Sequence, residues 1–147
     1  MFVHQATVED LDQIVPLFDG YRQFYGKPSD PIAARAFLLE RFENFQSVIF
    51  LANTTTGDAV GFTQLFPSFS SVSMARTFIL NDLYVSSDAR RNGVAAMLLE
   101  AAARYARAVG AIRISLTAAI DNNSAKALYF SQGWKQDEAF HVFHLGL

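Results

Sequence analysis

The chain has 147 residues, of which 51% are hydrophobic and 18% are charged, and its net charge is −2. A chain of this length fits one domain with a substantial core, so residues 1–147 are predicted to form a single domain. The slightly acidic balance disfavours nucleic-acid partners, and because cysteine is absent the chain has no disulfide, thiolate metal site or cysteine nucleophile.

The first half of the chain is predicted to hold two helices and four strands. Thr7 is a good N-cap for a first helix that Gly20 ends or bends. The pattern predicts a second helix at Ile32 to Phe42, and strands at Phe2 to Ala6, Ser47 to Ala52, Ala59 to Phe66 and Thr77 to Val85. Turn residues separate the last three strands, so these should run antiparallel to one another.

The second half alternates helices and strands. An alanine-rich helix from Val94 to Val109 leads to a strand at Ile112 to Ala118, which should run parallel to the preceding strand because a helix connects the two. A capped helix at Ala125 to Ser131 follows, and two short strands at Trp134 to Gln136 and Phe140 to Leu145 are expected to end the chain. The order predicts an α/β (α+β) fold.

The turn before the alanine-rich helix has the composition of an anion-binding site. Arg90-Arg91-Asn92-Gly93-Val94-Ala95 lies between a strand and a helix start. A glycine there lets the backbone approach a ligand, and the free N–H groups of the first helical turn favour a phosphate. The two arginines add permanent positive charge. The sequence therefore predicts a phosphate-binding turn.

Two motifs in order resemble the GNAT superfamily of acyl-coenzyme A dependent N-acyltransferases, over essentially the whole chain. The first motif has Arg or Gln at its first fixed position, Gly at its second and Gly or Ala at its third. Arg90, Gly93 and Ala95 fill these positions. The second motif is matched by a set about 30 residues further on: Asn122, Ala125, Leu128, Tyr129, Gly133 and Trp134. The short segments Asn81 to Val85 and Tyr21 to Tyr25 look similar to the Hpa-type and diamine acetyltransferases.

The resemblance implies a mixed, mainly antiparallel sheet of six or seven strands flanked by four helices, with a splayed parallel pair at its centre. It also implies acetyl-CoA as cosubstrate and no metal. The pantetheine arm would pair with the backbone of Leu83, Tyr84 and Val85, and would touch Asn122 and Ala125. The pyrophosphate would bind at the turn and helix start, formed by Arg90, Arg91, Asn92, Gly93, Val94, Ala95 and Ala96.

The same resemblance assigns the catalytic roles. Tyr129 occupies the position of the acid that protonates the departing thiolate. With no cysteine available, the acceptor amine should attack the thioester directly. Several relatives carry a glutamate base on the fourth strand, whereas strict alternation here predicts Ile79 and Asn81 on one face and Asp82 on the other. Asp82 is the nearest acid and the candidate base; binding the substrate's cationic end and supporting the sheet are the alternatives.

The acceptor is expected to be a primary amine. Candidate substrate-binding residues are Tyr21, Phe24, Tyr25 and Asn81. An acidic chain suits a small molecule or polyamine, and a protein lysine or N-terminus is the rival. A non-catalytic acyl-CoA-binding regulatory module is the alternative of another class, although such a module would not need Tyr129.

Two further expectations concern the localisation of the protein and its partners. No secretory signal precedes the first strand and no run approaches the roughly 20 apolar residues of a membrane span, so a cytoplasmic protein without a membrane partner is expected. Phe140 to Leu147 is apolar and could pair or exchange across a homodimer interface.

Overall fold

The computed structural model describes residues 1–147, and the chain folds into two compact units, residues 1–117 and residues 118–147. The larger unit holds five strands, three α-helices and two 3₁₀ turns. In chain order they are β1 Phe2–Gln5, η1 Val8–Asp10, α1 Leu11–Phe24, α2 Pro31–Glu43, β2 Val48–Asn53, β3 Ala59–Ser70, β4 Ala75–Val85, η2 Ser87–Ala89, α3 Val94–Ala108 and β5 Ile114–Ser115.

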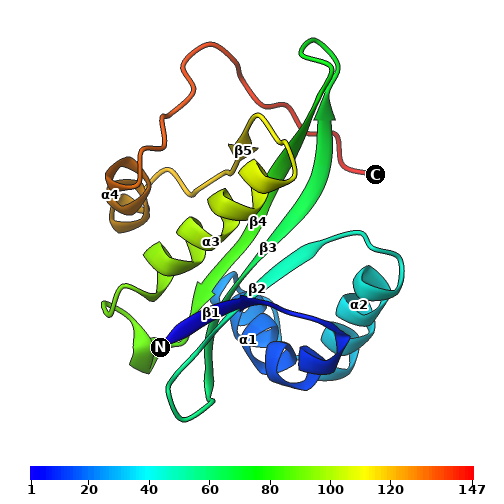
Figure 1. The fold of residues 1–147 in the computed structure, drawn as a ribbon, viewed down its shortest axis with the longest axis vertical. Helices are drawn as coiled ribbons and strands as arrows, with labels where there is room; N and C mark the ends of the chain where they lie inside the picture. The colour runs from blue at the N-terminus through cyan, green and yellow to red at the C-terminus, as the bar shows by residue number, and fades with distance from the viewer. The chain divides into compact units, whose positions relative to one another are not determined.

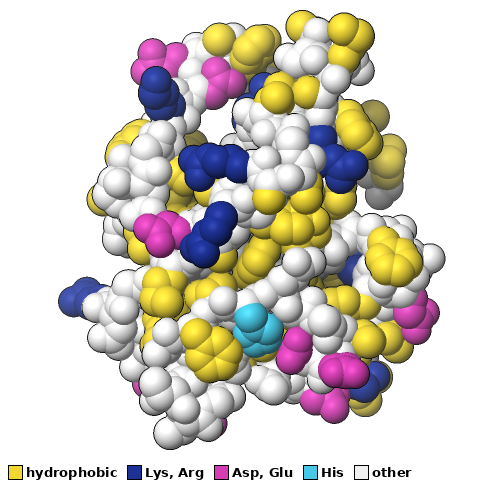
Figure 2. All heavy atoms as spheres, viewed as in Figure 1, with side chains coloured by type: hydrophobic (Ala, Val, Ile, Leu, Met, Phe, Trp, Pro, Cys, Tyr) yellow, Lys and Arg dark blue, Asp and Glu magenta, His cyan; other side chains and the backbone are white.

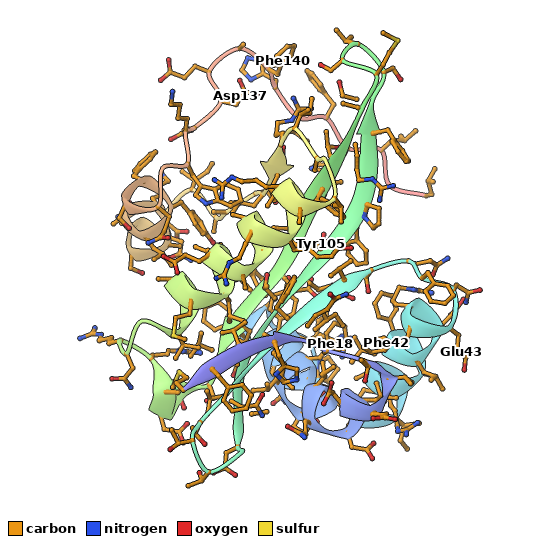
Figure 3. All side chains as sticks on the ribbon, in the orientation of Figure 1. Phe18, Phe42, Glu43, Tyr105, Asp137 and Phe140 are labelled. Atoms are coloured by element: carbon orange, nitrogen blue, oxygen red, sulfur yellow. The ribbon has the colours of Figure 1, made fainter.

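The five strands form one sheet in the order β1-β2-β3-β4-β5. The first three pairings are antiparallel and β4 pairs with β5 in parallel, as the sequence predicts. Helices α1 and α2 cover one face of the sheet and α3 covers the other (Figure 1). Figure 3 shows Phe18 and Phe42 among the side chains of the first face and Tyr105 on α3 over the second, where the Tyr105 ring meets Phe78 of β4.

The core of the larger unit lies mainly between α1, α2 and the sheet. Leu38, Leu51 and Phe62 are completely buried there, and Tyr21 and Tyr84 pack against the same cluster. The periodic apolar residues of α1 face this cluster because they recur every three or four positions. Sheet residues that point to this face are therefore held close to α1.

Helix α1 continues through Gly20 to Phe24, so the helix does not end at Gly20 as the sequence suggested. Gly20 serves a packing role. A Cβ atom at this position would lie 2.9 Å from the Tyr84 hydroxyl oxygen, which is closer than real Cβ contacts. The glycine thus lets the Tyr84 ring of β4 lie against the helix backbone, and the last turn of α1 reaches the end of β4.

Strand β4 contains a bulge that changes which side chains share a face. Leu80 pairs with Leu65, but Gln64 pairs with Asp82, so Asn81 is an extra residue without a partner on β3. Strict alternation therefore fails at this point. Asp82 lies on the same face as Ile79 and Gln64, and the predicted opposite placement of Ile79 and Asp82 is wrong. The bulge turns the Asp82 carboxyl toward α1.

The parallel pair of strands is short. Only Phe78 with Ile114 and Ile79 with Ser115 are in register, so the predicted strand from Ile112 to Ala118 is reduced to two residues. From Leu80 to Val85, β4 has no strand partner on the side of β5. This half of β4 therefore offers backbone donors and acceptors along an unpaired edge.

The smaller unit, residues 118–147, contains one helix, α4 Asn123–Ser131, and no strand. The two predicted strands at its end are therefore wrong. A strand exists only when its backbone is paired, and nothing within this unit pairs with residues 140–145. Phe140, Phe143 and Leu145 are largely exposed, and Figure 2 shows many hydrophobic side chains on the visible face.

The fold class is confirmed as a mixed α/β sheet with a parallel pair and four α-helices, with five strands in place of the six or seven expected. The parallel pair lies at one edge of the sheet, so its expected central position is wrong, because residues 118–147 form no strand that could extend the sheet beyond β5. No helix is both long enough and apolar enough to span a membrane.

Candidate active site

The predicted phosphate turn leads directly into α3 and leaves the helix start uncapped. Gly93 is the N-cap residue, and no side chain accepts a hydrogen bond from the first turn. Its carbonyl accepts from Met97 N at 3.1 Å, which closes the first helical bond. The N–H groups of Val94, Ala95 and Ala96 precede that bond and have no acceptor four residues back in the helix. They form a cluster of donors at the positive end of the helix dipole.

The turn also adopts the backbone shape of an anion nest. Arg91 has φ +64° and Gly93 has φ +77°, so two left-handed residues precede the helix. Conformations of this kind turn successive N–H groups toward one point. A Cβ atom on Gly93 would meet nothing within 4 Å, so the space over the turn is open. Arg91 and Asn92 are exposed beside it.

The Arg90 side chain turns away from the helix start and contacts the end of β4. Its Nε donates to the carbonyl oxygen of Val85 at 2.9 Å. Its guanidinium carbon lies 5.7 Å from the centroid of the Phe24 ring and 5.6 Å from that of Tyr84. The arginine therefore links the turn to β4 and to the last turn of α1, which is a contact that the motif alone does not predict.

Asp82 is buried at the bulge and is held by two side-chain amides. It is 2% exposed. Gln64 Nε2 donates to Oδ2 at 2.6 Å, and Asn81 Nδ2 donates to Oδ1 at 2.7 Å. Burial raises the pKa of the Asp82 carboxyl above its usual value, although hydrogen bonds from Asn81, Gln64 and Tyr21 lower it. A carboxylate with a raised pKa is a better proton acceptor than an exposed one.

The aromatic residues at the end of α1 form a group above this carboxylate. Tyr21 stacks edge-on against Phe62 and Tyr84, and its hydroxyl donates to the Asn81 carbonyl oxygen at 3.1 Å. Phe24 and Tyr25 are each about three-fifths exposed, at 61% and 60%. Tyr21 is thus part of the core packing, whereas the other two rings present surface to a ligand.

The loop after α1 is held by one buried carboxylate. Asp19 accepts hydrogen bonds from the Ser29 hydroxyl at 2.7 Å and from the Asp30 backbone N–H at 2.8 Å. These bonds hold the pKa of Asp19 below its usual value, with the backbone bond from Asp30 the largest cause. The Asp30 side chain in turn caps α2. Asp19 therefore fixes the path of the chain that follows Phe24 and Tyr25.

The second motif lies in the smaller unit. Asn122 caps α4, and its side-chain oxygen accepts from Ala125 N at 3.2 Å. Tyr129 lies on the same helix, partly buried, with its ring centroid 6.0 Å from that of Trp134. The Tyr129 carbonyl accepts from Trp134 N at 3.0 Å. The motif residues Asn122, Ala125, Tyr129 and Trp134 thus make one local structure.

Within the larger unit, the structure brings together Asn81, Asp82, Tyr84, Arg90 and the aromatic end of α1. Gln64 belongs to this cluster, and sequence reasoning missed it. The available signal was a polar pair, Thr63 and Gln64, inside an otherwise apolar strand. Both are completely buried, and the Thr63 hydroxyl donates to the Asp82 carbonyl oxygen at 2.8 Å.

The structure thus has a mixed sheet whose parallel pair ends after two residues, beside an uncapped, glycine-bearing helix start. The family model of the acetyltransferase (GNAT) family matches residues 13–134. The chain belongs to this family.

Relatives of known sequence agree with this membership. The chain is 46% identical to "Uncharacterized N-acetyltransferase YhfO" of Bacillus subtilis over 140 residues, covering 95% of this chain and 93% of that protein. It is 31% identical to "Probable acetyltransferase" of Haemophilus influenzae over 147 residues, covering 100% of this chain and 99% of the relative. The protein is therefore an acetyltransferase of the GNAT family.

Solved structures share the fold. A crystal structure of "a probable acetyltransferase" superposes with a TM-score of 0.95 at 44% identity, covering 100% of this chain and 98% of that chain. The narrower Hpa-type assignment stays a prediction. The D-amino-acid N-acetyltransferase HPA3 of Saccharomyces cerevisiae is 30% identical over 89 residues, which cover 60% of this chain and 55% of that protein.

Proposed function

We propose that this protein transfers the acetyl group of acetyl-CoA to the primary amine of a small molecule. One observation carries the proposal: the unpaired half of β4 runs from the buried carboxylate of Asp82 to the uncapped turn before α3. A long donor with an anionic end and a reactive thioester end requires such a path. Its charge would be held at the turn, and its thioester would lie near the bulge.

The residues present fit coenzyme A. The open space over Gly93 leaves room for a pyrophosphate, which the backbone donors of Val94, Ala95 and Ala96 would bind together with the Arg91 guanidinium. The edge of Leu83 to Val85 would pair with the amide groups of the pantetheine arm, as an added strand does. When bound, acetyl-CoA supplies an activated acyl group as a thioester. No group of three or more metal-ligating side chains lies together in the structure.

The bulge supplies the first catalytic element. Asn81 has no partner on β3 and β5 pairs only as far as Ile79, so we infer that a backbone N–H group at this edge of the bulge would face a ligand. An N–H group directed at the thioester oxygen would stabilise the negative charge that develops there during attack.

Asp82 would act as the general base. The acceptor amine must lose a proton to react, and the raised pKa of Asp82 equips the carboxylate to receive it. Because Asp82 is 2% exposed, we place one water molecule between the amine and the carboxylate. The same burial argues against direct binding of a cationic substrate group by Asp82.

Tyr129 would protonate the departing thiolate. A phenol has a pKa of about 10 and the thiolate's conjugate acid a pKa of about 8–9, so the tyrosine is only a modestly weaker acid. This role and the contribution of Asn122 and Ala125 to coenzyme A binding rest on the resemblance to the family. Exposed Phe24 and Tyr25 would line the acceptor side, together with Tyr21 and Asn81.

The test is a thiol-release assay with acetyl-CoA across small amines, polyamines, amino compounds and basic peptides. We expect sequential kinetics and the highest kcat/KM with a small primary amine. Turnover with peptides alone would replace the small molecule by a protein lysine or N-terminus. Binding of acetyl-CoA without turnover of any amine would overturn the enzymatic proposal and indicate an acyl-CoA-binding regulatory module.

A further inference from the structure

Gln64 is the buried residue whose hydrogen bonding is incomplete at the candidate base. It is completely buried, and its Nε2 donates to Asp82 Oδ2 at 2.6 Å. Its Oε1 is buried and has no hydrogen-bond partner. A buried polar atom without a partner costs about 1–3 kcal/mol. The buried Gln64 Oε1 without a hydrogen-bond partner therefore needs a structural or functional explanation.

A primary amide has two nearly identical edges. Rotation of the Gln64 amide by half a turn about its last side-chain bond exchanges Nε2 and Oε1 with little change in volume. In the present orientation Nε2 satisfies an ionised carboxylate. After rotation, Oε1 would face Asp82 Oδ2 and could accept a hydrogen bond from a protonated carboxyl. The separation of 2.6 Å suits an O–H···O bond.

We propose that Gln64 is a positioning residue whose amide donates to Asp82 when the carboxyl is ionised and, after half a turn, accepts from Asp82 when the carboxyl is protonated. The inference deepens the proposed function, since it rests on Asp82 acting as the base. With this partner, the base keeps a hydrogen bond on Oδ2 in both of its states. Neither state then leaves a buried carboxyl oxygen unsatisfied, and the proton transfer needs no rearrangement of the sheet.

The proton balance of the step is simple. The neutral amine nitrogen forms a bond to the acyl carbon and, as it does so, gives one proton to Asp82 through water; the carbon–sulfur bond then breaks. The sulfur leaves with the electron pair and takes a proton from Tyr129. Asp82 then returns its proton to solvent, and Tyr129 regains one. During the interval in which Asp82 holds the proton, Gln64 Oε1 is its acceptor.

The surroundings of Asp82 leave this role to Gln64. The groups that act on the carboxyl are Gln64 of β3, Asn81 of β4 and Tyr21 of α1, and none carries a charge at neutral pH. Asn81 Nδ2 donates to the other oxygen, Oδ1, and the Tyr21 hydroxyl donates its one hydrogen to the Asn81 carbonyl oxygen. The neutral amide of Gln64 is thus the group that can donate to Oδ2 when the carboxyl is ionised and accept from it when the carboxyl is protonated.

The experiment follows the Asp82 carboxyl by carbon-13 NMR titration of the free protein, with Asp82→Asn identifying its signal. Gln64→Met removes both amide edges at similar volume. We expect the Asp82 pKa to rise, because both states lose a hydrogen bond and the charge-assisted bond to the ionised form is the stronger of the two. On the acid side of its pH profile, kcat/KM should fall about tenfold and should converge with wild type at high pH. Thr63→Val is the matched control, since it removes a buried hydrogen bond to the Asp82 backbone and leaves the carboxyl untouched.

Two readouts decide the inference without relying on activity. The side-chain amide signals of Gln64 should change with the same midpoint as Asp82; amide signals that stay constant through that midpoint would overturn the exchange. An Asp82 titration that is the same in wild type and Gln64→Met would overturn any influence of Gln64. If Asp82→Asn retains full turnover, the proposed base is wrong, yet the NMR result still stands by itself.

Gln64→Glu covers the case in which the methionine variant does not fold. Two carboxyls 2.6 Å apart would share one proton, so the pair should titrate in two separated steps. A single step at the ordinary value of a carboxyl would contradict the proposed contact.

Discussion

The guanidinium carbon of Arg90 lies 5.6 Å from the centroid of the Tyr84 ring, and the Arg90 Nε donates to the carbonyl of Val85, the residue after Tyr84. Arg90 is the first residue of the phosphate turn, and Tyr84 lies on the strand that would bind the pantetheine arm. Phe24 of α1 contacts the same guanidinium. The Arg90 side chain thus connects β4, on the proposed acetyl-CoA side of the site, to Phe24 on the proposed amine side.

Replacing Arg90 by lysine should weaken these contacts between the turn, β4 and α1. Lysine keeps the charge but loses the Nε hydrogen bond and the planar face. The loss of about 1 kcal/mol should lower the Tm by about 3 °C. The KM for acetyl-CoA and for the amine should both rise. Arg91→Lys, one residue on and exposed, is the control and should leave Tm unchanged. Equal Tm values for the two variants in differential scanning fluorimetry would show that the Arg90 contacts do not stabilise the fold.

Gly93→Glu should abolish the rise in Tm that acetyl-CoA produces. The substitution places a negative side chain in the open space over the turn and repels the pyrophosphate. Gly110→Glu is a matched control, because Gly110 also has a positive φ, +81°, with open space around it, at the other end of α3. Both variants should lose similar stability without ligand. A ligand-induced shift that survives in Gly93→Glu would exclude the turn as the donor site.

The free energy of unfolding should depend on pH through Asp82. Its folded pKa is raised above the ordinary value of 3.8, so its stabilising contribution is present below that pH and is lost as the pH rises through the folded pKa. Asp82→Asn does not titrate. The variant should therefore gain stability relative to wild type as the pH rises through this window, in urea unfolding at a series of pH values. A constant difference would contradict the raised pKa.

Asp19 should show the opposite pH dependence. Its folded pKa is lowered, so its stabilising contribution is present above the ordinary value of 3.8 and is lost as the pH falls through the folded pKa. At neutral pH, Asp19→Asn should cost about 1–2 kcal/mol, because the buried side chain loses charge-assisted hydrogen bonds. Urea unfolding at pH 7 and at about pH 3 measures the difference, which should shrink in acid. A deficit that persists unchanged in acid would argue against an ionic role.

Tyr129→Phe should reduce kcat far more than it changes acetyl-CoA affinity, since the hydroxyl is needed only when the thiolate departs. General acid catalysis contributes about 10²–10⁴-fold. Steady-state kinetics and isothermal titration with acetyl-CoA separate the two quantities. Tyr105→Phe, on α3 and packed against Phe50 and Phe78, is the control for loss of a hydroxyl. Unchanged turnover in Tyr129→Phe would reject the assigned acid.

Features specified by neighbouring residues could be predicted from the sequence. The capping of α4 by Asn122 and the left-handed Gly93 before α3 are set within a few residues, as is the order of helices and antiparallel strands. The two motifs lie on such local features. The family could therefore be identified before any distance was known.

Features that depend on a partner far along the chain could not be predicted from the sequence. Asp82 points toward α1 because β3 pairs with β4 with one residue extra at Asn81, and nothing near Asp82 in the sequence specifies that register. Gly20 lies within α1 and leaves room for Tyr84, 64 positions away, against the helix. Residues 140–145 alternate like a strand, yet no strand forms without a paired neighbour.

The sequence by itself determined most of the helices, the antiparallel strands, the glycine turn before α3 and the membership in the acetyltransferase family, because caps, glycine conformations and periodicity act over a few residues. The tertiary structure alone decided the environment of the candidate base. Burial raises the pKa of Asp82 and the hydrogen bond from Gln64 lowers it, and both arise only when two strands meet across the sheet.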